Sequence, residues 1–115
     1  MAPTRIGVLV SGRGSNLQAL LDAIEEGRLH ARVVGVFSDR PGAPALEKVP
    51  EPLRWSRDAR GCDDRAAFDR MLGDAVAASG ADWVICAGYM RILGDGFVER
   101  FCGRLLNIHP SLLPA

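Results

Sequence analysis

The stretch IGVLVSGRGSNLQALLDAI, residues 6–24, joins an apolar segment, a glycine-rich turn and an amphipathic segment. Residues 6–10 form a short continuous apolar run, which is typical of a strand buried on both faces of a parallel sheet. The apolar side chains that follow recur at helical spacing, at Leu17, Leu20, Leu21 and Ile24. We expect Ser15 to cap this helix and Gly27 to end it.

The alternation of strand and helix continues along the chain. Further strands are expected at residues 32–37, 53–55, 83–87 and 105–109, and helices at 45–49, from Asp63 or Asp64 to Gly80, and at 95–101. Such alternation produces right-handed crossovers, so we predict an α/β fold with an open, mostly parallel Rossmann-like sheet and helices on both faces. A length of 115 residues favours a single domain, residues 1–115.

The composition argues against several functional classes. The 14 Lys and Arg residues balance 14 Asp and Glu residues without charge runs, so we expect neither nucleic acid nor a membrane as a partner. Cys62, Cys86 and Cys102 lack metal-ligand spacing, so we expect no metal site and no disulfide framework. Without a signal peptide or an apolar stretch of membrane-spanning length, the expected location is cytoplasmic.

The glycine loop, residues 11–16, can receive a phosphate. Glycines allow close approach of a ligand, and the helix N-terminus offers unpaired N–H groups to an anion. A tight turn without a ligand explains the loop equally well. Leu17 stands where a dinucleotide fingerprint needs a small residue, and no Gly-Lys-Ser/Thr follows, so a single phosphate is favoured over NAD or ATP.

Two further segments follow predicted strands. In residues 87–93, AGYMRIL, the apolar side chains either pack in the core, Ile92 in particular, or form an apolar slot for a flat ring with Arg91 near a carboxylate. In residues 105–114, LLNIHPSLLP, Asn107 and His109 share one side of an extended chain. An amide donor beside an imidazole can polarise a carbonyl and move a proton.

All three segments lie at the carboxyl ends of predicted strands. Ligands of open parallel sheets bind at this edge, where the strand order reverses. If the first strand and the strand at residues 83–87 are neighbours, the glycine loop, the apolar slot and the Asn107/His109 pair meet in one crevice. Their joint placement is far more specific than any one motif.

At these residues the chain resembles the folate-dependent formyltransferases, and among them the phosphoribosylglycinamide formyltransferases of purine biosynthesis. The similar stretches are VLVSGRGSNL (8–17), VFSD (36–39), AGYMRIL (87–93) and GRLLNIHPSLLP (103–114). The resemblance implies transfer of a formyl group from 10-formyltetrahydrofolate, as cosubstrate, to the amine of glycinamide ribonucleotide, with no metal.

The resemblance also implies roles for individual residues. The substrate phosphate would be held by Gly14, Ser15 and Asn16, and Gly88 would lie along the glycinamide. The folate would contact Arg65, near its glutamate end, and Met90, Arg91, Ile92 and Leu93. Asn107 and His109 would be catalytic.

The chain departs from the family pattern in two respects. The segment of residues 45–57 is shorter than usual and carries prolines that interrupt a helix. The family's catalytic aspartate would lie beyond Ala115, so we expect the chain to be the N-terminal domain of such an enzyme, with little turnover alone. The last strand, residues 105–108, would then be an exposed edge through which copies could associate.

Three other functions remain open at this stage. The chain could bind a phosphate ligand without chemistry, or belong to a related folate formyltransferase or formyltetrahydrofolate deformylase. A nucleotide module of an oxidoreductase is the third, and Leu17 argues against it.

Overall fold

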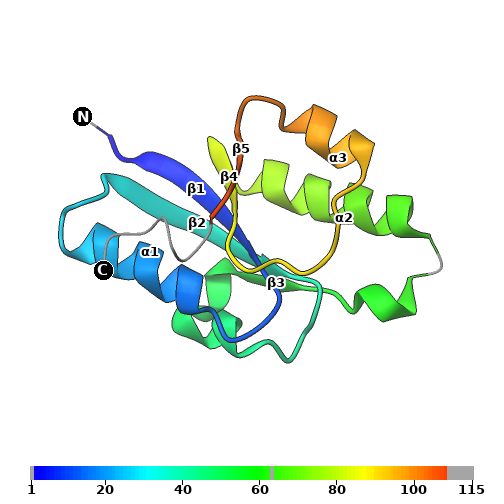
Figure 1. Ribbon diagram of the computed structural model, residues 1–115, viewed down its shortest axis with the longest axis horizontal. Coiled ribbons are helices and arrows are strands. Elements are labelled where there is room, and N and C mark those ends of the chain that lie inside the picture. Colours follow the sequence, from blue (N-terminus) through cyan, green and yellow to red (C-terminus); the bar gives the residue numbers. More distant parts are fainter. Residues whose placement is uncertain (1, 63, 109–115) are drawn as a thin grey trace.

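The computed structural model describes residues 2–62 and 64–108, in which five parallel strands form one sheet (Figure 1). The strands are β1 (Thr4–Val10), β2 (Ala31–Ser38), β3 (Arg54–Ser56), β4 (Trp83–Cys86) and β5 (Leu105–Asn107), in the spatial order β3-β2-β1-β4-β5. The helices are α1 (Ser15–Glu25), α2 (Arg65–Ala78) and α3 (Asp95–Arg100), with 3₁₀ turns η1 (Pro44–Lys48), η2 (Glu51–Leu53) and η3 (Ala59–Gly61).

Helix α1 covers one face of the sheet, and α2 and α3 cover the other (Figure 1). The alternation of side chains along β1 divides the core between these faces. Val8 and Val10 pack in the cluster that includes Leu17 and Leu20 of α1. Leu9 packs with the residues of α2 and α3 on the opposite side. Both faces of β1 are therefore buried, as its continuous apolar run predicts.

The strand order places the first turn of α1 beside the loop that follows β4. Strand β1 pairs with β2 on one side and with β4 on the other, so the chain changes direction across the sheet between β1 and β4. This pairing confirms the neighbourhood on which the predicted crevice depends. Strand β5 pairs only with β4 in the described part of the chain, and its Leu106 is exposed.

The predicted fold class is confirmed, whereas some local predictions are wrong. Helix α1 is capped by the backbone of Gly14 and not by Ser15, which is already helical. Asp64 does cap α2, because its carboxylate accepts a hydrogen bond from the Ala66 N–H. The third strand begins at Arg54 instead of Leu53, since the prolines before it favour two 3₁₀ turns.

Candidate functional site

The glycine loop between β1 and α1 has a shape that requires glycine. Gly14 has a φ of +86°, and a Cβ atom there would lie 2.6 Å from the Cβ of Ala45. The Ala45 N–H donates to the Gly12 carbonyl over 3.1 Å, which holds the loop against η1. No side chain caps α1, so its first N–H groups lack an acceptor from a capping side chain.

The structure places the three predicted phosphate ligands, Gly14, Ser15 and Asn16, at this first turn of α1. The Ser15 side chain is exposed, whereas Asn16 is buried. The Asn16 amide nitrogen lies 3.9 Å from the position of a Cβ on Gly88, whose φ is +79°. Two residues 72 positions apart, both predicted to contact the ribonucleotide, thus lie together at the carboxyl edge of the sheet.

A cavity of about 380 Å³, here named the ring slot, opens beside the ends of β4 and β5. It is lined by Cys86, Tyr89, Arg91, Leu93, Val98, Leu105, Leu106 and Asn107. The lining is mainly apolar with a few polar groups, as expected for a site that takes a flat ring. Asn107 joins the slot because the Ile108 N–H bonds to the Cys86 carbonyl and fixes the end of β5 against β4.

Alternate side chains of the loop after β4 face opposite ways. Tyr89, Arg91 and Leu93 line the ring slot, whereas Met90 and Ile92 are 73% and 75% exposed. The core packing considered for Ile92 is therefore wrong, because its side chain is directed to solvent. Met90 and Ile92 do not line the slot.

Burial changes the properties of polar groups in the slot. The Tyr89 hydroxyl and the Arg91 Nε are buried and have no hydrogen-bond partner in the described part of the chain. Burial, with a smaller contribution from Asp39, raises the pKa of Tyr89, so its hydroxyl stays protonated at neutral pH. Burial also raises the pKa of the Cys86 thiol to about 11, which agrees with its predicted role as a small apolar residue.

A second cavity, of about 620 Å³, is lined by Met90 and shares Arg91 with the ring slot; it is here named the arginine crevice. Its lining includes Arg13, Arg40, Arg60 and Arg91, which come from four different loops. Asp58 pairs with Arg60, whereas Arg13 and Arg40 are exposed and form no ion pair among the described residues. Sequence reasoning missed this crevice, because these arginines are scattered along the chain.

Ser11 connects three strand ends and was also missed as a site residue. Its hydroxyl donates to the Asp39 carboxylate over 2.7 Å and accepts from the Met90 N–H over 2.8 Å. Ser11 and Asp39 lie within SGRGSN and VFSD, two stretches that resemble the formyltransferases. That resemblance was the signal that could have identified them as site residues.

The remaining predicted site residues are Arg65 and His109. Arg65 begins α2, is exposed, and is not among the residues lining the ring slot or the arginine crevice. His109 lies outside the described residues. Among residues 2–62 and 64–108, no group of three His, Cys, Asp or Glu side chains could hold a metal, and no helix could span a membrane.

Comparison with known proteins adds independent evidence. A family model described as formyl transferase matches residues 4–115. The phosphoribosylglycinamide formyltransferases of Mycobacterium tuberculosis (strain CDC 1551 / Oshkosh) and Escherichia coli (strain K12) are 47% and 44% identical to this chain. These matches cover 99% and 95% of this chain but only 53% and 52% of the two relatives.

A solved structure agrees with the sequence matches. Glycinamide ribonucleotide transformylase 1 from Symbiobacterium toebii superposes with a TM-score of 0.86 at 46% identity. The superposition covers 98% of this chain and 54% of that protein. The chain thus spans about half the length of the curated relatives it matches.

Proposed function

The chain belongs to the formyl transferase family, and from this premise we propose that it takes part in formyl transfer from 10-formyltetrahydrofolate to the amine of glycinamide ribonucleotide, as a cytoplasmic protein of purine biosynthesis. One observation carries the proposal: Asn16 lies beside Gly88, and the ring slot that Asn107 lines opens at the same edge of the sheet. A phosphate seat, a ring site and a hydrogen-bond donor therefore adjoin one another.

Glycinamide ribonucleotide binds with its phosphate at the first turn of α1. The N–H groups of Gly14, Ser15 and Asn16, with the Ser15 hydroxyl, donate hydrogen bonds to the phosphate oxygens. The exposed Arg13 adds positive charge from the adjoining arginine crevice, which favours approach of an anion. The glycinamide then runs past Gly88 towards the end of β5.

The folate places its ring system in the ring slot, against Leu93 and the apolar part of the Arg91 side chain. Met90 and Ile92, which are exposed, contact the part of the folate outside the slot, and Arg65 lies towards its glutamate end. Binding both substrates at one edge raises their effective concentration, a contribution of roughly 10⁵–10⁸ M in favourable cases.

The chemistry is an acyl transfer. The glycinamide amine attacks the formyl carbon, a tetrahedral oxyanion forms, the bond from that carbon to the folate nitrogen breaks, and the amine proton passes to that nitrogen. Asn107 and protonated His109 donate hydrogen bonds to the oxyanion, and loss of one such donor typically costs about 10²–10³ in rate.

Titration calorimetry with crossed variants tests the assignment of the two sites. Glycinamide ribonucleotide and 10-formyltetrahydrofolate are titrated separately into wild type, Ser15→Ala and Leu93→Ala. We expect Ser15→Ala to weaken only ribonucleotide binding and Leu93→Ala to weaken only folate binding, each by roughly tenfold, the loss of about one hydrogen bond or part of an apolar contact. If either variant weakened both ligands equally, or neither ligand bound wild type, the proposed assignment would be wrong.

A further inference from the structure

Two buried aspartates lie under the loop between β4 and α3, and the proposed chemistry uses neither. Asp39 follows the end of β2 and is 5% exposed, and Asp69 lies on α2 and is 6% exposed. Burial of a carboxylate is unfavourable unless hydrogen bonds compensate for it. The partners of these two carboxylates therefore indicate their role.

Asp39 reaches the loop through Ser11. Ser11 is 1% exposed, and its hydroxyl donates a hydrogen bond to Oδ1 of Asp39 over 2.7 Å. An ionised carboxylate can only accept, so this bond fixes the direction of the hydroxyl and leaves the lone pairs of its oxygen for another donor. That donor is the backbone N–H of Met90, 2.8 Å away. The segment from Met90 to Gly94 is thus attached at its first residue to the ends of β1 and β2.

Asp69 holds the other end of the same loop. The backbone N–H of Gly94 donates to Oδ2 of Asp69 over 2.8 Å, and Gly94 is also the residue that precedes α3. A Cβ on Gly94 would lie 2.8 Å from that oxygen, so the close approach depends on glycine. The two hydrogen bonds enclose Arg91, Ile92 and Leu93.

We propose that Ser11, Asp39 and Asp69 are positioning residues that fix the register of this loop. With Met90 and Gly94 held, Arg91 and Leu93 face the ring slot and Ile92 faces solvent. A shift of the loop would remove Arg91 and Leu93 from the positions in which they line the slot. The identity of the ligand in the ring slot depends on the proposed function, but the register of the loop does not.

Amide hydrogen exchange resolved by residue tests the proposal without any ligand. In Ser11→Ala we expect the Met90 amide to exchange at least tenfold faster, with Gly94 unchanged, and in Asp69→Ala the reverse. Asp39→Asn should retain protection at Met90, since an amide oxygen can still accept from Ser11. The matched control is Ser38→Ala, a fully buried serine whose hydroxyl accepts from the Arg40 N–H and forms no hydrogen bond with the loop.

Equal loss of Met90 protection in Ser11→Ala and Ser38→Ala, or no loss in Ser11→Ala, would overturn the proposal. If a variant does not fold, amide exchange in wild type alone tests whether the loop is held at Met90 and Gly94. Its Met90 and Gly94 amides should exchange at least tenfold more slowly than the Ile92 amide, which has no acceptor in the described part of the chain. Equal exchange at all three positions contradicts the proposal.

A binding measurement links the register to the slot. Titration of 10-formyltetrahydrofolate should give a roughly tenfold higher Kd for Ser11→Ala than for Ser38→Ala, and Asp39→Asn should retain most of the wild-type affinity. Equal Kd values for Ser11→Ala and Ser38→Ala would refute the role of Ser11 in shaping the slot. If wild type bound no folate, the proposed function would fail, while the exchange experiment would still decide whether the loop is held.

Discussion

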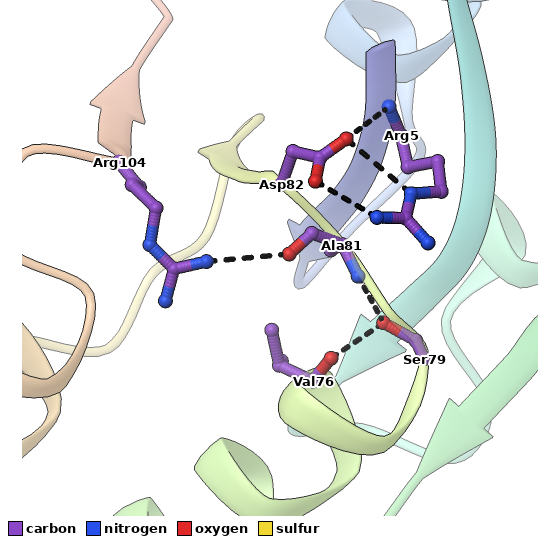
Figure 2. Close-up of polar contacts among 6 residues, drawn as sticks. All are labelled: Arg5, Val76, Ser79, Ala81, Asp82 and Arg104. Carbon is purple, nitrogen blue, oxygen red and sulfur yellow. Dashed lines mark hydrogen bonds and ion pairs between the residues drawn. The ribbon is translucent and has the colours of Figure 1, made fainter. Parts of the chain in front are cut away.

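At the amino ends of the strands Asp82 receives three hydrogen bonds from Arg5 (Figure 2). At the carboxyl ends, by contrast, two buried polar atoms, on Tyr89 and Arg91, have no partner among the described residues. Figure 2 shows further closure at the amino edge, where Arg104 donates to the Ala81 carbonyl and Ser79 bridges the end of α2 to Ala81. The amino edge joins its loops through satisfied contacts and has a cavity of about 200 Å³ beside Thr4, Ala31 and Trp83, whereas the carboxyl edge holds the larger ring slot and arginine crevice.

We interpret the difference between the two edges as a difference in function. Buried polar groups normally have hydrogen-bond partners, so an unpartnered one indicates strain or a place for a ligand. Positive φ does not distinguish the edges, since it occurs at Gly14 and Gly88 of the carboxyl edge and also at Gly27, Gly80 and Gly103 before the amino ends of strands. The unpartnered groups therefore place the proposed formyl transfer at the carboxyl edge, and we expect substitutions at the amino edge to alter stability alone.

The largest expected effect is on the rate of formyl transfer. We would measure it in a fusion of residues 1–115 to the part of the Escherichia coli relative that this chain does not match. Asn107→Ala should reduce the rate by about 10²–10³, because one donor to the oxyanion is lost. Asp82→Asn, the control at the amino edge, should leave the rate unchanged. A near wild-type rate for Asn107→Ala would remove Asn107 from the mechanism.

Labelling of Cys86 provides the next largest effect. Because burial raises the pKa of its thiol to about 11, iodoacetamide at pH 8 should label Cys86 at least tenfold more slowly in the folded chain than in urea. Cys102 is exposed and serves as the internal reference. Between about pH 9 and pH 11 the unfolded thiol ionises first, so this group should lower the stability of the fold as pH rises. Equal labelling in the folded and unfolded chain would contradict the burial.

Replacing two glycines of positive φ, one at each edge, distinguishes the cost of backbone strain from the cost of steric crowding. Gly14→Ala adds backbone strain and a clash with Ala45, and should lower the free energy of unfolding by roughly 3 kcal/mol. Gly80→Ala, at the amino edge, has a similar φ but meets only the far end of the Arg5 side chain, and should cost about 1 kcal/mol. Urea unfolding measures both, and equal losses would mean that crowding at the glycine loop is unimportant.

The two edges also show which features of the fold and of the candidate site could be predicted from the sequence. The strands, and a helix capped by Asp63 or Asp64, follow from local patterns. That β1 and β4 are neighbours was only a condition of the predicted crevice, and the structure establishes it. The burial of Asp39 and Asp69, the outward direction of Ile92 and the clustering of Arg13 with Arg40 depend on contacts between loops distant in the sequence. Local periodicity carries no information about such contacts, so these features became visible only in the structure.

The smallest expected effect concerns Asp82. Side-chain hydrogen bonds from Arg5, with the Arg5 backbone N–H, lower the pKa of Asp82 below its ordinary value of 3.8. The stabilisation is therefore complete above the unfolded pKa and is lost as pH falls through the folded one. The difference in urea midpoint between wild type and Asp82→Asn should be small, constant from pH 5 to 7, and should disappear at lower pH. A difference that grew on acidification would contradict this pairing.

The most direct test of the assignment to the carboxyl edge is a map of backbone amide shifts by NMR during titration with glycinamide ribonucleotide and then with 10-formyltetrahydrofolate. We predict saturable shifts at residues 12–16 and Gly88 with the first ligand and at residues 86–93 and Asn107 with the second. Arg5 and Asp82 should not move with either. Saturable shifts confined to the amino edge, or none at the glycine loop and the ring slot, would contradict the account.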